Sequence, residues 1–441
     1  MESTHRAHRA GAGVSRRRYL AALGAGAGAV LAACGTPGGN GAAPGAGGTP
    51  GAAPGGEVSV LYYTTTEPAI QRMQKQEAAI NQLLPQVKLS MVPVPTDIDG
   101  KFVTMAAGGT APDISWMGVG FWQHAPANRV AVLDDLVARD RAFNLKEYYP
   151  QAIDLFRYKG KMQALAYGVN THVVAYNKGM LDKAGVKYPT AEWTLPDYTA
   201  TARRLTSAPG VEPQTWGAWI WNLWIALWMW GGQIYDKDYT RALIDQPAAI
   251  SGLQFYYDQS FGNLKIAPAQ GTYHQLFGNG QLAITNVAPF GVPVLRQYQG
   301  LEWDLLTMPW TAEKKRGTWM SGEGYAIATE SRNKDGAWAV LKYLCGRDAM
   351  TSFYAPEFQA IPAVRPVAET AFLQAIPGKN AKAFLDSIDY ATPYGGHPVV
   401  TRWGDVLNPM WNDVRDGKTS APDAARDAAP RLNDLLKSTA P

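Results

Sequence analysis

The sequence predicts an α/β protein made of two domains, or of one domain with two lobes. A chain of 441 residues is longer than a typical domain with a single hydrophobic core. Hydrophobic residues make up 46% of the chain and charged residues 18%, so there is ample apolar material for packed cores. Apolar segments of strand length alternate with segments of helical periodicity, which favours parallel sheets covered by helices.

The alternation is clearest in the first part of the folded body. The elements expected there are a strand at 58–63, a helix beginning at Thr66-Glu67-Pro68, a strand at 87–94, a helix at 101–107 and a strand at 114–117. Parallel strands present ligand sites beyond their carboxyl ends. The loops at 64–67 and 118–122 are therefore candidate ligand loops.

The rest of the chain continues the pattern. We expect strands at 173–177, 282–285, 303–306 and 325–328, and helices that begin at Thr194 or span 221–230, 247–260, 334–345 and 423–437. The apolar stretch at 216–230 is shorter than the roughly 20 residues that a membrane-spanning helix needs, and it contains Asn222. We therefore predict no membrane span there.

Residues 1–34 are typical of an export signal. A basic stretch is followed by an apolar stretch at 19–33 and then by Cys34. Ser15-Arg16-Arg17-Arg18-Tyr19-Leu20 resembles a twin-arginine signal, and Leu31-Ala32-Ala33-Cys34 resembles a bacterial lipobox. The prediction is lipid attachment at Cys34, which would anchor the protein outside the cytoplasmic membrane. The alternative is a plain signal peptide with a chance cysteine.

Residues 35–56 are almost wholly Gly, Ala, Pro, Thr and Asn, and they predict a flexible tether. Cys345 is the only cysteine after Cys34, so the mature chain has no intrachain disulfide, and its apolar surroundings predict a buried thiol. The formal net charge of +4 comes from the first 34 residues, because the remainder holds 36 basic and 36 acidic residues. This balance excludes a nucleic-acid binder that works by neutralising phosphates.

An ordered series of short motifs carries a family resemblance. Gly108-Gly109-Thr110-Ala111-Pro112-Asp113-Ile114 resembles a stretch of the extracytoplasmic solute-binding proteins of sugar-type ABC importers, among them the maltodextrin-binding proteins. Further matches follow in family order at 154–167, 173–178, 184–195, 231–232, 277–284, 361–362 and 417–436. The resemblance runs from about residue 57 to the end of the chain. Two departures are Gly168, where the family usually has proline nearby, and Glu323, which interrupts an expected Gly-Gly.

The resemblance implies a two-lobe periplasmic-binding-protein-like fold of type II, with mixed, mostly parallel sheets and a hinge. The predicted organisation is a signal at 1–34, a tether at 35–56, a first lobe at 57–168 and 323–365, and a second lobe at 169–322 and 366–441. It also implies a monomer that captures a carbohydrate between its lobes and delivers it to the membrane permease subunits of an ABC importer. A phosphorylated polyol such as glycerol phosphate is the alternative ligand.

Sugars present apolar C–H faces and a ring of hydroxyls, so their sites need flat aromatic rings and short polar side chains. Six tryptophans lie between residues 216 and 230, and Trp221, Trp224 and Trp228 are predicted to share one helical face. Counted back from Gly231-Gly232, Trp221 and Trp224 align with an aromatic pair that stacks on sugar in the maltodextrin-binding relatives. For Trp228 we favour core packing.

Other candidate ligand contacts are spread along the chain. Trp403 falls near a late tryptophan of the relatives, and Asn170 falls where they place a polar cleft residue. The remaining candidates are Thr64, Thr66 and Glu67 after the first strand, Trp122 at the rim or in the cleft, Asn286, and the group Trp319, Gly322 and Glu323. Thr66 also fits a helix cap, and Asn170 also fits a loop-stabilising role. Trp116 is expected in the core, and Arg365 at the surface.

Catalytic and metal motifs are absent from the sequence. The histidines of the mature chain lack metal-ligand spacing, and neither CxxC nor GxSxG occurs. We therefore predict no enzyme activity, no cofactor and no metal. A surface glycoside hydrolase stays as a lesser alternative, because paired carboxylates need no fixed sequence separation.

Overall fold

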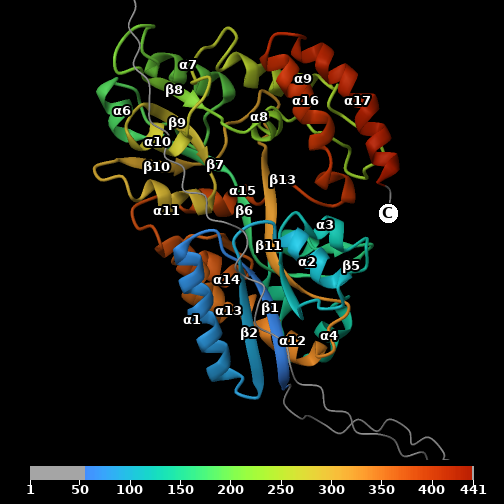
Figure 1. Cartoon of the computed structure of the whole chain (residues 1–441). Coiled ribbons are helices and arrows are strands. Elements are labelled where there is room, and N and C mark those ends of the chain that lie inside the picture. Colours follow the sequence, from blue (N-terminus) through green and yellow to red (C-terminus); the bar gives the residue numbers. More distant parts are fainter. Residues whose placement is uncertain (1–54, 440–441) are drawn as a thin grey trace, which may run out of the picture. The chain divides into compact units, whose positions relative to one another are not determined.

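Two β-sheets organise residues 55–439, the part of the chain that the computed structural model describes (Figure 1). The predicted signal, Cys34 and nearly all of the predicted tether lie outside these residues. The elements around the seven-stranded sheet are called the first lobe, and those around the four-stranded sheet the second lobe. No helix of residues 55–439 is both long and apolar enough to cross a bilayer.

The strands follow the chain in this order: β1 Gly56–Tyr63, β2 Val87–Val94, β3 Ile114–Met117, β4 Arg157–Tyr158, β5 Lys161–Met162, β6 Leu165–Thr171, β7 Val173–Asn177, β8 Trp216–Trp219, β9 Leu282–Val287, β10 Trp303–Leu306, β11 Thr318–Ile327, β12 Ile361–Pro362 and β13 Ala391–Pro393. The predicted strands at 87–94, 114–117, 173–177 and 303–306 have the observed bounds.

Both sheets are mixed. In the first sheet the order is β12-β6-β11-β3-β1-β2, and β13 pairs with β11. β1 is parallel to β2 and β3, whereas β11 is antiparallel to β3 and β6. The second sheet has the order β10-β7-β9-β8, in which only β8 and β9 are parallel. Antiparallel pairing is thus commoner than the sequence predicts. The reason is that β11, which is distant in the sequence, inserts antiparallel between β3 and β6.

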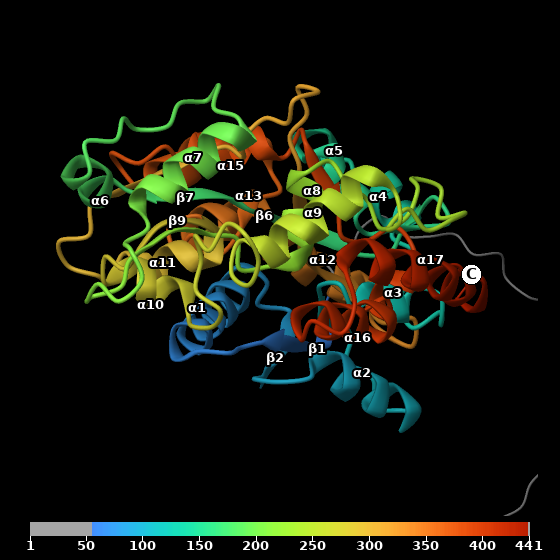
Figure 2. The ribbon, with the colours of Figure 1, turned by 90° about the horizontal axis from the view of Figure 1, so that it is seen from above.

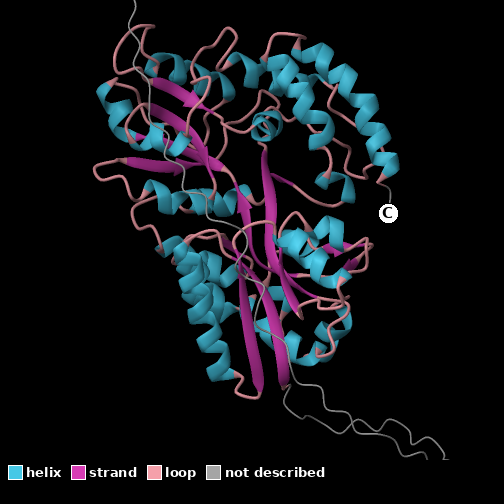
Figure 3. Cartoon of the chain, in the orientation of Figure 1, coloured by secondary structure: helices cyan, strands magenta, loops and turns pink. Residues whose placement is uncertain are grey.

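Helices flank both sheets (Figure 3). Their bounds are α1 Glu67–Leu83, α2 Ile98–Ala107, α3 Phe121–His124, α4 Asp134–Arg139, α5 Pro150–Asp154, α6 Lys178–Lys183, α7 Leu195–Leu205, α8 Leu223–Met229, α9 Pro247–Asp258, α10 Tyr273–Gly278, α11 Val292–Leu295, α12 Lys334–Leu344, α13 Arg347–Ala349, α14 Arg365–Val367, α15 Lys382–Ser387, α16 Gly404–Arg415 and α17 Ala421–Ser438. Short 3-10 or π turns span Leu145–Glu147, Pro289–Gly291, Met350–Tyr354, Ala368–Phe372 and Pro398–Thr401.

Capping side chains fix the starts of several helices. The Thr66 hydroxyl accepts from the Ala69 amide at the start of α1, and Thr194 forms a capping box with Asp197 at the start of α7. Both caps confirm the predicted starts. Asn222 caps α8, so Trp221 precedes the helix and does not share a helical face with Trp224 and Trp228. The predicted start at residue 221 is wrong because the Asn222 side chain accepts hydrogen bonds from the backbone amides of Trp224 and Ile225. Asn222 is therefore the N-cap, and the helix begins after it.

The sequence analysis missed β8 and the first part of β11, as well as β4, β5, β6, β12 and β13. The aromatic run 216–219 forms β8, because a short apolar run fits a buried strand as well as a helix. β11 begins at Thr318, seven residues before the predicted strand, because Gly322 and Gly324 interrupt its apolar pattern.

The chain passes between the lobes near the middle of the molecule. β6 and β7 are separated by His172 alone, so one nearly continuous strand enters both sheets. The amino-terminal end of β11 pairs with β13, and the rest of β11 crosses the first sheet (Figure 1). The lobe boundary at residue 168 stays a prediction, although β6 remains in the first sheet as far as Thr171. In the view of Figure 2, α8 lies beside α9 and α16 beside α17, in agreement with their packing contacts.

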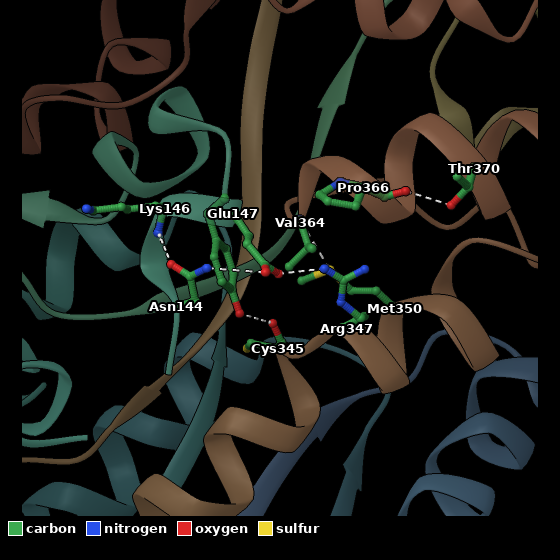
Figure 4. Close-up of polar contacts among 10 residues, drawn as sticks. Asn144, Lys146, Glu147, Cys345, Arg347, Met350, Val364, Pro366 and Thr370 are labelled. Carbon is green, nitrogen blue, oxygen red and sulfur yellow. Dashed lines mark hydrogen bonds and ion pairs between the residues drawn. The ribbon is translucent and has the colours of Figure 1, made fainter. Parts of the chain in front are cut away.

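Polar contacts join the turn Leu145–Glu147 to the end of α12 and to α13 in the first lobe (Figure 4). The Tyr148 hydroxyl donates to the carbonyl of Cys345 at 2.7 Å, and Arg347 pairs with Glu147 at 2.7 Å. Cys345 is fully buried, and burial raises the pKa of its thiol well above the ordinary value. The predicted buried thiol is confirmed.

Candidate ligand-binding cleft

Two cavities open where the lobes meet. The larger, here called the β1 cavity, has a volume of about 940 Å³. On the first lobe it is bordered by the end of β1, the start of α1 and β3. On the second lobe it is bordered by the 3-10 turn Pro289–Gly291 and by α11 with the residues up to Gln297. Its volume is that of ordinary small-molecule sites.

Aromatic rings from both lobes line the β1 cavity. Tyr63 and Trp116 stack with ring centroids 4.8 Å apart at the ends of β1 and β3. Phe290, which is 43% exposed, enters from the second lobe. A large apolar ring that is left exposed in a cavity is the kind of surface on which a sugar face stacks.

A polar group centred on the half-buried Glu323 forms one wall of the same cavity. The Tyr167 hydroxyl donates to one carboxylate oxygen of Glu323, and Asn170 Nδ2 donates to the other at 2.5 Å. Trp116 Nε1 in turn donates to the Tyr167 hydroxyl at 3.2 Å. A carboxylate can accept about four hydrogen bonds, so Glu323 retains acceptor capacity after these two.

Burial raises the pKa of the Glu323 carboxyl above its ordinary value of 4.5, although the bonds from Tyr167 and Asn170 and the charge of Arg72 oppose the shift. The other charged pair of the cavity is satisfied internally. Arg72 is buried, donates to the Tyr62 hydroxyl at 3.1 Å and forms an ion pair with Glu357. The first-lobe wall therefore offers a hydroxyl acceptor, and its one cation, Arg72, is already paired, whereas Arg296 lines the second-lobe side of the cavity.

Glu323→Gln is expected to raise the free energy of unfolding at about pH 8 and to leave it nearly unchanged at about pH 4. A carboxyl with a raised folded-state pKa binds its proton more tightly in the folded chain. Ionisation of this carboxyl therefore destabilises the folded state. The effect is absent below the pKa of the group in the unfolded chain, grows as the pH rises towards its pKa in the folded chain, and is complete above that value. Urea denaturation of both proteins at the two pH values measures the difference. Parallel pH dependence of the two proteins would contradict the prediction.

The smaller cavity, here called the α16 cavity, has a volume of about 400 Å³. α2 and α3 of the first lobe form one side, and Trp224, Tyr394 and Trp403 form the other. Trp403 Nε1 donates to the Tyr394 hydroxyl at 2.9 Å, and the rings of Trp224 and Trp403 lie 5.9 Å apart.

Aromatic contacts connect the two cavities. His172 lies 6.4 Å from Phe290 and 5.2 Å from Trp319, measured between ring centroids. Trp319 then contacts Tyr394, which contacts Trp403. These contacts run through packed side chains, since His172 is fully buried.

The hydrogen bonds of Asn286 determine which ring nitrogen of His172 carries the proton. The Trp221 amide donates to Asn286 Oδ1 at 3.2 Å, so Asn286 Nδ2 is the atom that faces His172 Nδ1, at 3.0 Å. Nδ1 is therefore an acceptor, and Nε2 carries the proton. Burial lowers the pKa of His172 to about 3, so the ring stays neutral at physiological pH.

Several buried polar atoms around the cleft have no hydrogen-bond partner among the described residues. They are Thr64 Oγ1, Asn170 Oδ1, His172 Nε2 and Trp319 Nε1. Buried donors and acceptors are normally paired, and each unpaired one is unfavourable by about 1–3 kcal/mol. Ligand hydroxyls that reach these atoms as the lobes move would remove that penalty.

The structure brings most of the predicted site residues to this region. Thr66 and Glu323 line the β1 cavity, Trp224 and Trp403 line the α16 cavity, and Asn170, Trp221, Asn286 and Trp319 belong to the hydrogen-bond and aromatic contacts between them. Thr64 is buried behind the end of β1.

Three predicted contacts lie elsewhere. Glu67 is exposed on α1 and lines neither cavity. Gly322 packs inside the first lobe, where an added Cβ would lie 2.8 Å from the Phe156 ring. Trp122 is 3% exposed and not at a rim, because Phe121 and Tyr158 pack edge-on against it and Gly395 covers its Nε1.

Other residues of the cleft were missed or misplaced in the sequence reading. Trp116 was expected in the core, and Tyr63, Tyr167, Phe290 and Tyr394 were not singled out. Tyr63 and Trp116 had a usable signal, since they lie at the carboxyl ends of parallel strands. Arg365 lies over the Tyr149 ring at 5.0 Å and is exposed, as predicted.

Fold and cleft together define a binding protein of two α/β lobes. The family model for bacterial extracellular solute-binding proteins matches residues 72–381, and the chain belongs to this family. A binding protein of Brucella abortus is 24% identical over 397 residues, which cover 85% of this chain and 92% of the relative. The maltotriose-binding protein of Pyrococcus abyssi is 20% identical over 317 residues, covering 67% of this chain and 66% of the relative.

Solved structures show the same fold. An ABC substrate-binding protein of Listeria monocytogenes, in complex with cycloalternan, matches with a TM-score of 0.76 and 22% identity. The match covers 86% of this chain and 99% of that one. The expected two-lobe α/β fold is confirmed.

Proposed function

We propose that this protein binds a neutral mono- or oligosaccharide between its lobes and delivers it to the permease of an ABC importer. The observation that carries the proposal is the β1 cavity, where rings from both lobes flank the Glu323 carboxylate. Stacked rings hold the apolar faces of a sugar, and a buried carboxylate accepts from its hydroxyls. The ligands named for two relatives, maltotriose and cycloalternan, are both carbohydrates.

The cavity chemistry favours a sugar over glycerol phosphate. A phosphate needs convergent cations or helix N-termini. On the first-lobe wall Arg72 is already paired with Glu357, and the Glu323 carboxylate would repel a phosphate. Arg296 and the start of α1 also border the cavity, so the preference for a neutral ligand rests on Glu323. The relatives described above are binding proteins, which favours capture over hydrolysis of the sugar.

The mechanism is a shift in population. Ligand contacts made by both lobes stabilise the closed arrangement, which the permease then recognises. His172 and β11 lie where the chain passes between the lobes. A movement of one lobe against the other would therefore change the contact between His172 and Trp319 of β11. An affinity in the micromolar range corresponds to about −8 kcal/mol, which stacking and several hydrogen bonds can supply.

Titration with a panel of neutral sugars, followed by tryptophan fluorescence, tests the ligand class. We expect a saturable change for at least one mono- or oligosaccharide, because Trp116, Trp224 and Trp403 line the two front cavities, the β1 cavity and the α16 cavity. Glycerol phosphate and a short peptide are the comparison ligands. A response to either of these, with none to any sugar, would overturn the proposal.

We further propose that the protein is anchored by lipid at Cys34 on the outer face of the cytoplasmic membrane. Cys34→Ser is expected to move the protein from the membrane fraction to the soluble extracytoplasmic fraction, because it removes the thiol that carries the acyl chains. Fractionation and immunoblotting measure the shift. Unchanged membrane association would favour the plain signal peptide and another mode of attachment.

A further inference from the structure

Asp99 is the one charged side chain among the described residues that line the α16 cavity. It lies in the first turn of α2, on the first-lobe side of the cavity, whereas Trp224 and Trp403 lie on the other side. Its side chain is 30% exposed, so the carboxylate is accessible at the cavity wall. This carboxylate has no part in the Glu323 group, which borders the β1 cavity.

His124 holds one oxygen of this carboxylate. His124 Nε2 lies 2.9 Å from Asp99 Oδ1. A carboxylate can only accept, so Nε2 carries the proton and donates. The imidazole is fully buried, and Phe102 packs edge-on against it with the ring centroids 4.9 Å apart. His124 Nδ1 has no hydrogen-bond partner among residues 55–439, so the polar role of this ring is directed to Asp99.

Gly120 lets the carboxylate lie against the backbone of the cavity wall. A Cβ added at Gly120 would lie 2.2 Å from each of the two Asp99 oxygens, and Gly120 itself lines the cavity. The place of the carboxylate is therefore set by the glycine on one side and by His124 on the other. The bond from His124 uses only one of about four acceptor positions, so Asp99 retains acceptor capacity.

The surroundings of Asp99 suit a guest with several hydroxyl groups. Gln123 and Asn408 are exposed side chains of the same lining, and their amide groups both donate and accept. The rings of Trp224 and Trp403 offer flat apolar surfaces on the other side. A sugar hydroxyl can use the carboxylate and both amides, whereas a cation can use only their acceptors.

We propose that Asp99 accepts a hydrogen bond from a sugar hydroxyl in the α16 cavity, and that His124 is the residue that positions it. With Oδ1 held by His124, Oδ2 is the oxygen that meets the sugar. The inference rests on the proposed function and adds to it a second carboxylate that selects for a hydroxyl, separate from Glu323.

Calorimetric titration of the full chain with maltotriose, or with the sugar of the panel that binds more tightly, tests the role of Asp99. Asp99→Asn is expected to bind about tenfold more weakly. His124 still donates to the amide oxygen in this variant, so the NH₂ group faces the sugar and replaces an acceptor with a donor. Asp97→Asn is the matched control and should bind as wild type does. It removes the same charge two residues away, lines neither cavity, and keeps a side chain that caps α2.

The positioning role of His124 is tested in two backgrounds. His124→Phe is expected to weaken binding about fivefold in the wild-type chain and to cause no further loss in Asp99→Asn. His124→Gln keeps an N–H donor and should restore most of the affinity. Thermal unfolding of each variant shows whether it is folded at the temperature of the titration.

Each outcome separates this inference from the proposed function. If wild type binds a sugar and Asp99→Asn binds it equally well, or if Asp97→Asn loses as much affinity, the role of Asp99 is overturned and the proposed function stands. An equal loss from His124→Phe in both backgrounds would overturn the positioning role, because His124 would then act through the packing of the lobe. Absence of sugar binding by wild type would overturn the proposed function and this inference together.

Discussion

Glu323→Ala is expected to weaken sugar binding by about 100-fold, the largest effect of any single substitution in the cleft. Glu323 receives hydrogen bonds from Tyr167 and Asn170, which hold its carboxylate in place while leaving acceptor capacity for ligand hydroxyls. Each hydrogen bond to a charged group is worth about 1.5–3 kcal/mol, so losing one or two of them gives this magnitude.

Isothermal titration with the best sugar of the panel measures the effect. Glu369→Ala is the matched control, because Glu369 is an exposed glutamate that lines neither front cavity. The control should bind as wild type does. An affinity of Glu323→Ala within about threefold of wild type would show that the carboxylate does not touch the ligand.

Trp221→Ala is expected to weaken sugar binding by more than about tenfold without unfolding the protein. The indole is held rigidly, since its Nε1 donates to the carbonyl of Asn286 at 2.9 Å and Tyr273 stacks on one face at 5.1 Å. It is also partly exposed and lies against His172 at the junction of the lobes. A ring that is fixed before binding loses little entropy when a sugar stacks on it.

Trp310→Ala provides a close control for this substitution. Trp310 is also a partly buried tryptophan of the second lobe, and its Nε1 also donates to a backbone carbonyl, that of Ala191, at 3.1 Å. Like Trp221 it lines neither front cavity, but unlike Trp221 it has no aromatic contact with His172 at the junction of the lobes. Titration together with thermal unfolding should show weaker binding in Trp221→Ala alone. Equal loss in both variants would point to general destabilisation, and no loss in either would remove Trp221 from the site.

Local sequence patterns predicted the helix starts and most strands, because caps and short apolar runs act over a few residues. Thr66 and Thr194 cap helices as expected, and the strand at 303–306 has its predicted bounds. Pairing between distant segments was out of reach. β11 joins β6, β3 and β13 across long sequence separations, and nothing in its glycine-interrupted sequence indicates these partners.

The candidate site divides in the same way. Trp224 and Trp403 were found through family spacing, and Glu323 was found as a departure from the family's Gly-Gly in a loop of small residues; all three line a cavity between the lobes. Phe290 and His172 were missed because their roles depend on where the second lobe places them against Trp319 and the first lobe. Trp122 was misplaced because its cover, Gly395, lies far away in the sequence.

A crystal structure of the protein with its best-binding sugar tests the central claim most directly. The account predicts that the sugar contacts Trp116 or Tyr63 on one lobe and Phe290 or Trp221 on the other, with a hydroxyl within hydrogen-bond distance of the Glu323 carboxylate. A sugar bound to one lobe alone, or bound with Glu323 out of reach, would contradict it.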